Sequence, residues 1–449
     1  MAKRTDQRPT IVPTRVTVPF QATPAGQPPS VRAWANRAVW TERMLTTLEQ
    51  GVRGGRWHTL IDKVYQPSNL WLASMNVLGN QGAAGVDQQT VEQFGMQDMA
   101  ETQRLSEELR TERYRPQPVK RVWIPKPGST EKRPLGIPTV RDRVVQTALL
   151  HVLEPIFDST FAEHSYGFRR GRGCHHALER IETLLNEGYV YIVDADLKSY
   201  FDTIPKDRLM ERVRERVSDS RVLRLVEMFL NQGVMDGLQE WTPETGTPQG
   251  AVISPLLANL YLNPLDHLVA ASGFAMVRYA DDFVILCRTR EEADRALAVV
   301  GRWVEDHGLT LHPTKTKIVN ARTEEFAFLG YLFRGALRLP RGKSLDKLKD
   351  TIRAHTRRTH GQSLAWIVGS LNSTLQGWFG YFRHCHWNVF TTLDSWLRGR
   401  LRSILRKRAG RQGRGRGADH QRWPNQYFTD LGLYSLVRAH GRLGQSLTG

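Results

Sequence analysis

Two pairs of aspartates stand at the ends of strand-forming runs. The run YVYIVDADL carries Asp194 and Asp196 near its end, and MVRYADDFVILC carries Asp281 and Asp282 between two apolar stretches. An isolated pair of aspartates is usually a solvated turn. Here both pairs follow strand-forming sequence, so we expect the two strands to be neighbours in one sheet and Asp196 and Asp281 to converge.

Converging carboxylates repel each other unless a cation lies between them. Oxygen donors with no supporting cysteine or histidine favour Mg²⁺, or alternatively Mn²⁺, over zinc. Such ions suit in-line phosphoryl transfer, because one activates the attacking oxygen and the other stabilises the leaving oxygen. The basic segment 114–139 would then hold triphosphate charge through Lys126 and Arg133.

Local patterns predict the elements that must position these residues. Apolar residues recur at helical spacing over about 34–109 and again over 364–382, which predicts helical blocks. The stretch GTPQGAVISPLLANLYLNPL predicts a Gly/Pro loop that leads into an apolar helix, with Ser254 as N-cap and Pro255 in the first turn. RYADDFVILC and FAFLGYLF each predict a hairpin.

The composition indicates a polyanionic partner. Among 449 residues, 63 Lys and Arg outnumber 45 Asp and Glu, for a formal charge of +18. Nucleic acid is the first expectation, ahead of an anionic membrane, and a merely basic soluble protein is the alternative. In the run 398–422, Asp419 is alone among many arginines, which favours phosphate contact over a solvated tail. Three scattered cysteines and no long apolar run predict a soluble, cytoplasmic protein.

Seven motifs follow one another along the chain: IPKPGSTEKRPLGIPT, HSYGFRRGRGCHHAL, DADLKSYFDTI, GTPQGAVISPLLANLYL, RYADDFVILC, GLTLHPTKTKIV and FAFLGYLF. Their order and spacing resemble the successive reverse-transcriptase blocks of the group II intron-encoded family, over about residues 60–335. SLAWIVGSLNSTLQGWFGYFRHC resembles the family's thumb, or maturase domain X, and RWPNQYFTDLGLYSL resembles the C-terminal segment of bacterial members.

The resemblance implies an α+β fold of the right-hand polymerase type, with fingers, a palm built on an antiparallel sheet, and a helical thumb. It divides the chain into a Pro-rich flexible arm (1–33), a helical extension of the fingers (34–109), fingers and palm (110–345), thumb or domain X (346–410) and a basic nucleic-acid-binding segment (411–449). The HNH endonuclease found in many family members has no counterpart in this sequence, so we do not expect second-strand DNA cleavage.

The resemblance also implies catalytic and metal-binding residues. It makes Asp196 and Asp281 the principal metal ligands and Asp282 the third acid of the site. The backbone carbonyl of Leu197 matches a further metal ligand of polymerase palms. Asp194 has no counterpart among the ligands, although strand alternation puts it on the same face as Asp196.

Other residues match positions that bind the incoming nucleotide. Phe201 matches the aromatic residue that closes against the sugar 2′ carbon and excludes a ribose hydroxyl, with an ordinary core phenylalanine as the alternative. Lys315 matches a lysine that protonates the leaving pyrophosphate, although Lys317 lies two residues on. The remaining matches are the triphosphate clamp, Lys126 and Arg133, and the nucleotide-binding loop, Gln249 and Gly250, where glycine permits a close backbone approach.

The implied function is that of an RNA-directed DNA polymerase, which extends a DNA primer on an RNA template with dNTPs and two Mg²⁺ ions. The same protein would bind group II intron RNA to assist splicing and retrohoming, in the bacterial cytoplasm and on nucleoid DNA. One alternative is a free-standing reverse transcriptase that the host uses in defence or DNA repair. Another is a catalytically silent RNA-binding splicing factor, against which the intact acids argue.

Overall fold

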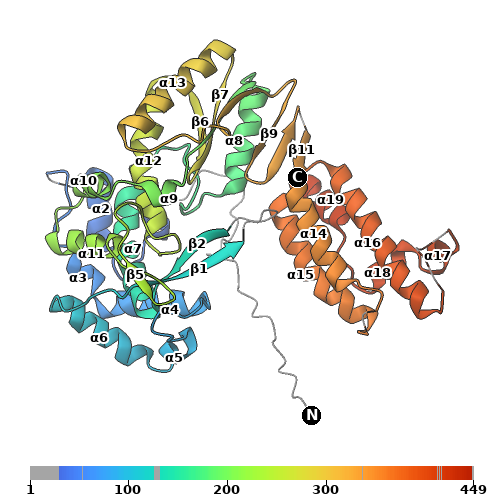
Figure 1. Cartoon of the computed structure of the whole chain (residues 1–449), viewed down its shortest axis with the longest axis horizontal. Helices are drawn as coiled ribbons and strands as arrows, with labels where there is room; N and C mark the ends of the chain where they lie inside the picture. The colour runs from blue at the N-terminus through green and yellow to red at the C-terminus, as the bar shows by residue number, and fades with distance from the viewer. Residues whose placement is uncertain are drawn as a thin grey trace. The chain divides into compact units, whose positions relative to one another are not determined.

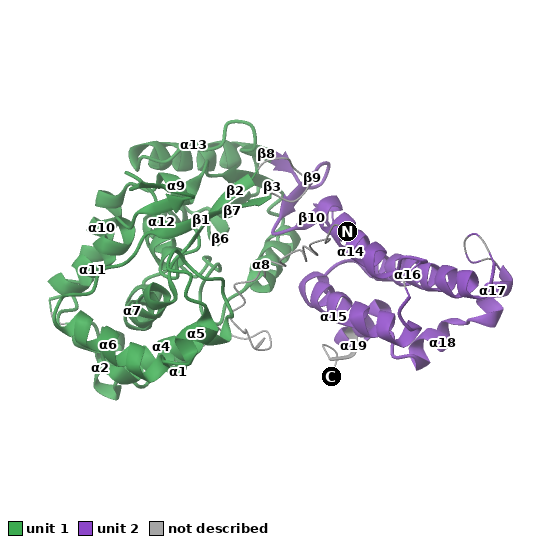
Figure 2. Cartoon of the chain, turned by 60° about the horizontal axis from the view of Figure 1, so that its bottom comes forward, with its two compact units in different colours: residues 1–318 green, residues 319–449 purple. Residues whose placement is uncertain are grey.

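The computed structural model describes residues 30–52, 54–125, 132–335, 337–359, 361–411, 413, 415 and 417–446. The chain forms two compact units, residues 1–318 and 319–449 (Figures 1 and 2). Both units combine helices with largely antiparallel sheets, which confirms the predicted α+β class. Most of the predicted Pro-rich arm, residues 1–29, lies outside the described residues. No helix in the described part of the chain has both the length and the apolar character needed to cross a membrane.

The first unit contains much more helix than strand. Its helices are α1 (Val31–Trp34), α2 (Glu42–Gln50), α3 (Ile61–Val64), α4 (Pro67–Gly79), α5 (Val91–Gly95), α6 (Asp98–Arg110), α7 (Val140–Asp158), α8 (Cys174–Asn186), α9 (Tyr200–Thr203), α10 (Lys206–Arg214), α11 (Ser220–Leu230), α12 (Ser254–Ala271) and α13 (Arg290–Asp306). The helical block predicted over 34–109 is confirmed, and its longest helices, α4 and α6, pack on each other and on α7.

The central sheet has the strand order β6-β7-β3-β8. Its strands are β3 (Tyr191–Asp196), β6 (Ala275–Tyr279), β7 (Asp282–Cys287) and β8 (Lys317–Asn320). The strand β3 pairs antiparallel with β7, so the predicted neighbourhood of the two aspartate-bearing strands is confirmed. The helix α13 packs on β3 and β7, whereas α8 and α12 pack on β6. These helices bury the apolar side chains that make the sheet a rigid support.

A second sheet in the first unit has the order β2-β1-β4-β5. Its strands are β1 (Val119–Pro125), β2 (Lys132–Ile137), β4 (Val234–Asp236) and β5 (Gln239–Trp241). The loop that follows β5 leads into α12, as predicted, with Pro255 in the first turn. The prediction that Ser254 caps this helix is wrong. Ile253 holds the N-cap position, because the Ser254 hydroxyl instead donates to the Pro248 carbonyl, 2.9 Å away, and closes the loop.

The second unit joins a three-stranded sheet to a group of helices. Its strands, in the order β11-β10-β9, are β9 (Glu325–Phe328), β10 (Tyr331–Arg334) and β11 (Leu337–Pro340). Its helices are α14 (Gly342–His355), α15 (Leu364–Phe382), α16 (Trp387–Arg408), α17 (Gly417–Arg422), α18 (Asn425–Asp430) and α19 (Leu436–Ser446). The predicted hairpin in FAFLGYLF and the predicted helix over 364–382 are both confirmed.

Candidate active site

Three aspartates meet at one end of the central sheet. In the register of β3 and β7, Asp196 lies directly opposite Asp282. Opposite residues of an antiparallel pair project from the same face, so these two carboxylates are neighbours. Asp281 occupies the tight turn between β6 and β7, beside Ala280. Asp194 pairs with Val284, further from the turn, and by alternation shares the face of Asp196.

The electrostatics of this cluster favour a cation among the carboxylates. Burial raises the pKa of Asp281, and the negative charge of Asp196 raises it further, while Arg278 opposes the shift. The Lys315 ammonium lies 2.8 Å from Asp196 Oδ2, so the chain supplies one cation of its own. Ionised carboxylates crowded in this way are stabilised by a cation placed among them.

The donor set fits a hard divalent cation. Carboxylates of Asp196 and Asp281, with Asp282 beside them, are the oxygen ligands that Mg²⁺ and Mn²⁺ prefer. The backbone beyond β3 continues past Leu197, where the Asp196 carbonyl accepts from the His312 N–H at 2.7 Å. On the other side of the Leu197–Leu311 bridge, Lys198 N–H donates to the Thr310 carbonyl at 2.9 Å, and neither of these two bonds uses the Leu197 carbonyl. Among the described residues, no group of three or more acidic, histidine or cysteine side chains is placed so that it could hold a metal ion by itself.

Replacing Lys315 with alanine is expected to lower the Mg²⁺ concentration at which the carboxylate site is half-saturated. The lysine and the metal compete for Asp196, and an exposed ion pair of this kind is worth about two- to five-fold in binding. The measurement is the Mg²⁺ dependence of primer extension, the activity that the family resemblance implies. Lys317→Ala removes the same charge two residues away and serves as the control. An unchanged half-saturation in Lys315→Ala would show that the ion pair does not compete with the metal.

A fully buried arginine holds the turn that carries Asp281. Arg278 is 0% exposed and forms a bidentate ion pair with Asp266, with Nε 2.7 Å from Oδ1. Its Nη1 donates to Asn259 Oδ1 and to the Ala280 carbonyl, both at 2.8 Å. Ala280 has a φ of +61°, a left-handed conformation that costs a non-glycine residue about 1–2 kcal/mol. Arg278 therefore holds a strained turn from inside the protein.

The loop of the HSYGF motif closes over the same turn. Tyr166 N–H donates to the Arg278 carbonyl at 2.8 Å, and Asn259 Nδ2 donates to the Gly167 carbonyl at 2.7 Å. A Cβ at position 167 would lie 2.3 Å from the Ala280 nitrogen, so the backbones approach too closely for any side chain there. The HSYGF motif therefore stabilises the turn that carries Asp281.

Sequence reasoning missed Arg278 and Asp266. A signal was present, because each is a charged residue inside an apolar run, MVRY and LNPLDHLV. Opposite charges at inward positions of a strand and of the preceding helix are a pattern that a buried ion pair explains.

The residues expected to face the nucleotide are joined by hydrogen bonds between α9 and the loop before α12. The Thr247 N–H donates to the Phe201 carbonyl at 2.7 Å, and Gln249 Nε2 donates to Asp202 Oδ2 at 3.0 Å. The Phe201 ring is half-buried and packs edge-on against Tyr200, with centroids 5.6 Å apart. The structure thus brings Phe201 and Gln249 to one place next to the end of β3.

The strand β2 is fixed to the same loop. Gly136 N–H donates to the Gln249 carbonyl at 2.6 Å. Gly250 has a φ of +107°, and a Cβ there would lie 2.4 Å from the Gly136 carbonyl oxygen, so glycine is required. Arg133 is exposed on this strand, three residues before Gly136. Lys126, the other predicted triphosphate ligand, lies outside the described residues.

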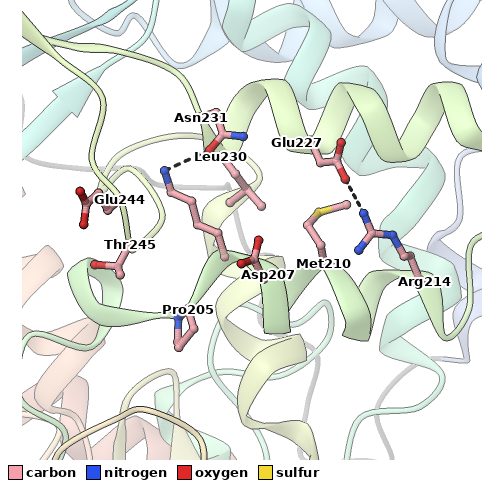
Figure 3. A pocket seen from close by; sticks show the side chains of 10 residues that line it. Pro205, Asp207, Met210, Arg214, Glu227, Leu230, Asn231, Glu244 and Thr245 are labelled. Atoms are coloured by element: carbon pink, nitrogen blue, oxygen red, sulfur yellow. Dashed lines mark hydrogen bonds and ion pairs between the residues drawn. The ribbon is translucent and has the colours of Figure 1, made fainter.

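A cavity of about 310 Å³ lies apart from the aspartates, between α10 and α11 (Figure 3). Its cations already have partners. Lys206 Nζ donates to Asn231 Oδ1 at 3.2 Å, and Arg214 forms an ion pair with Glu227. The predicted site residues do not line this cavity.

Comparison with known proteins identifies two family domains. Residues 124–333 match the family described as reverse transcriptase (RNA-dependent DNA polymerase), and residues 345–423 match the maturase-specific domain of group II introns. Protein YkfC of Escherichia coli (strain K12) is 36% identical over 318 residues, which cover 62% of this chain and 83% of YkfC. Group II intron-encoded protein LtrA of Lactococcus lactis subsp. cremoris is 35% identical over 206 residues, 45% of this chain and 34% of LtrA.

Among solved structures, a partial Cas6-RT-Cas1–Cas2 complex has a similar chain, with 24% identity and a TM-score of 0.36 over 56% of this chain and 42% of that one.

The fold, the cluster of acids and the domain match together define a reverse transcriptase, an RNA-directed DNA polymerase. The chain belongs to the family of group II intron reverse transcriptases and maturases. Reverse transcriptases use divalent metal ions and act on RNA templates.

Proposed function

We propose that Asp196 and Asp281 hold two Mg²⁺ ions with which the chain extends a DNA primer on an RNA template. Asp282 and the Leu197 carbonyl complete the set of ligands. The observation that carries this proposal is the pairing of β3 with β7, with three carboxylates at one sheet end and a lysine ammonium already on one of them. When bound, the ions activate the primer 3′-OH and offset the charge of the leaving pyrophosphate.

The chain's own residues orient the nucleotide. Phe201 occupies the space that a ribose 2′-OH would need, and Gln249, held by Asp202, lies beside it. Arg133, with Lys126, binds the triphosphate through charge-assisted hydrogen bonds. Lys315 is close enough to the acids to deliver a proton to the departing pyrophosphate.

We propose further that the chain binds the RNA of a group II intron and assists its splicing and retrohoming. The match of residues 345–423 to the maturase-specific domain supports this role, as does the basic charge of residues 319–449. The direct test is splicing of the intron RNA in vitro at a salt concentration where the RNA alone is inactive. Splicing that does not depend on added protein would contradict the maturase role.

The polymerase proposal is tested by extension of a DNA primer on an RNA template. We expect the purified protein to extend the primer with dNTPs and Mg²⁺, and Phe201→Val to raise ribonucleotide incorporation by about 10- to 200-fold, because the smaller side chain leaves room for a 2′-OH. The measurement is the ratio of kcat/KM for a dNTP and the matching rNTP.

Phe201→Tyr keeps a ring at this position and should keep the preference for dNTPs. If Phe201→Val also keeps it, the phenylalanine is a core residue and the gate lies elsewhere. If the parent protein extends no primer under any metal condition, the polymerase proposal itself is wrong.

A further inference from the structure

The second unit holds most of the chain's excess positive charge. Residues 319–449 contain 23 of the 63 Lys and Arg but only 7 of the 45 Asp and Glu. A surface with this imbalance attracts a polyanion. The total charge does not say which side chains contact the polyanion. The hydrogen bonds within the unit help to decide this, because they show which arginines already have partners in the protein.

Two arginines of the basic run 398–422 are used inside the unit. Arg402 is 3% exposed, and its Nε donates to the Trp423 carbonyl at 2.9 Å. Arg406 Nη1 lies 2.7 Å from Asp419 Oδ2, so the acid that stood alone among arginines in the sequence has a partner within the protein. These two side chains attach the segment after α16 to that helix. The predicted phosphate contact of the run 398–422 therefore falls to its other basic residues.

Arg400 lies on a different side of α16. Two residues turn an α-helix by about 200°, so Arg400 points away from the direction of Arg402. Its Nε donates to Thr356 Oγ1 at 2.6 Å and its Nη2 to the Thr356 carbonyl at 3.2 Å. Thr356 is the C-cap of α14 and is 1% exposed. The guanidinium is therefore fixed to the end of a neighbouring helix, and its Nη1 has no hydrogen bond to a described residue.

Two further arginines, Arg353 and Arg358, lie near Arg400. The guanidinium carbons of Arg353 and Arg400 lie over the Trp396 ring, 5.8 and 5.5 Å from its centroid. Partial burial lowers the pKa of Arg400, and the positive charges of Arg353 and Arg358 lower it further. One carboxylate, that of the exposed Asp350, pairs with Arg353 at 2.6 Å. Arg400 is thus repelled by two further guanidinium groups, those of Arg353 and Arg358. Arg353 lies on α14 and Arg400 on α16, two helices that Figure 2 labels.

We propose that Arg353 and Arg400, which lie over Trp396, bind backbone phosphates of RNA together with Arg358. Guanidinium groups are well matched to phosphate oxygens, and a phosphate would remove the repulsion among them. Because guanidinium groups cover the Trp396 ring, this residue supports the cations and does not stack a base. The contact is therefore independent of base sequence. The inference rests on the proposed function, since the RNA is the one on which that function acts.

The test is equilibrium binding of a fluorescent single-stranded RNA, and separately of an RNA–DNA template–primer, across a salt series without dNTPs. Each lost phosphate contact should reduce the slope of log affinity against log salt by about 0.7–0.9. We expect this reduction in Arg400→Gln, Arg353→Gln and Arg358→Gln. A reduction with the template–primer alone would assign the site to the hybrid, and a reduction with both would assign it to RNA backbone in general.

Arg334→Gln is the matched control, because it removes the same charge from an exposed ion pair with Glu325 in the same unit. The proposed site would be wrong if the three cluster variants kept the parent protein's slope of log affinity against log salt. It would also be wrong if Arg334→Gln reduced that slope equally. Arg353 and Arg358 are exposed, so their variants test the site even if Arg400→Gln unfolds the cap of α14. Binding is measured without polymerisation, so a parent protein that binds RNA through these residues but extends no primer would disprove the polymerase proposal alone.

Discussion

Asp281→Asn is expected to lower the rate of primer extension by at least about a thousand-fold, on the order of 4 kcal/mol in activation free energy. The amide keeps the size of the side chain and removes the charge that holds a metal ion. The same change should leave the protein as stable as the parent, or slightly more stable. Burial and the charge of Asp196 raise the pKa of Asp281 in the folded state. The folded protein therefore disfavours the ionised form of Asp281. Ionisation of this carboxyl lowers the free energy of unfolding, and the loss grows as the pH rises from the unfolded pKa of the group to its folded pKa.

Two measurements on one preparation separate these effects: single-turnover extension at saturating Mg²⁺, and thermal unfolding at neutral pH. Asp294→Asn, in an exposed ion pair with Arg290, is the control for loss of one carboxylate. Extension at the parental rate by Asp281→Asn would disprove its role as a metal ligand. Asp282→Asn tests how much the exposed third acid contributes to the rate of primer extension. We expect this variant to retain more activity than Asp281→Asn.

Arg278→Met is expected to destabilise the protein by about 3–5 kcal/mol, because it leaves the Asp266 carboxylate buried without a partner. Activity should also fall, since the Ala280 carbonyl loses the donor that holds the Asp281 turn. A single variant cannot separate a loss of activity caused by unfolding from one caused by displacement of the Asp281 carboxylate.

The double variant Arg278→Met with Asp266→Leu makes that separation. Replacing both members of a buried ion pair with apolar residues of similar size is often neutral for stability, so most of the lost stability should return. The turn still lacks its donor, and a displacement of about 1 Å in a reacting group can cost on the order of 100-fold in rate. We expect kcat to stay low with little change in the KM for dNTP. A stable double variant with parental kcat would show that Arg278 serves the fold alone.

Much of the site followed from local sequence. The aspartates interrupt apolar runs of period two, and such runs form strands wherever they can pair. The tight hairpin at Ala280–Asp281 and the loop before α12 also followed from short-range patterns. The N-cap of α12 was misplaced by one residue, because the Ser254 hydroxyl bonds backward to Pro248, a choice that depends on how the loop closes.

The sequence by itself determined the family, the two aspartate-bearing strands and the sign of the charge, since these depend on residue type and on spacing along the chain. Only the tertiary structure decided the register that sets Asp196 opposite Asp282, and the buried pair of Arg278 with Asp266. It also decided which arginines of the second unit are already paired, as Arg406 is with Asp419. The physical reason is that a charged side chain takes its role from its partner, and the partner is chosen by packing between segments that are distant in the chain.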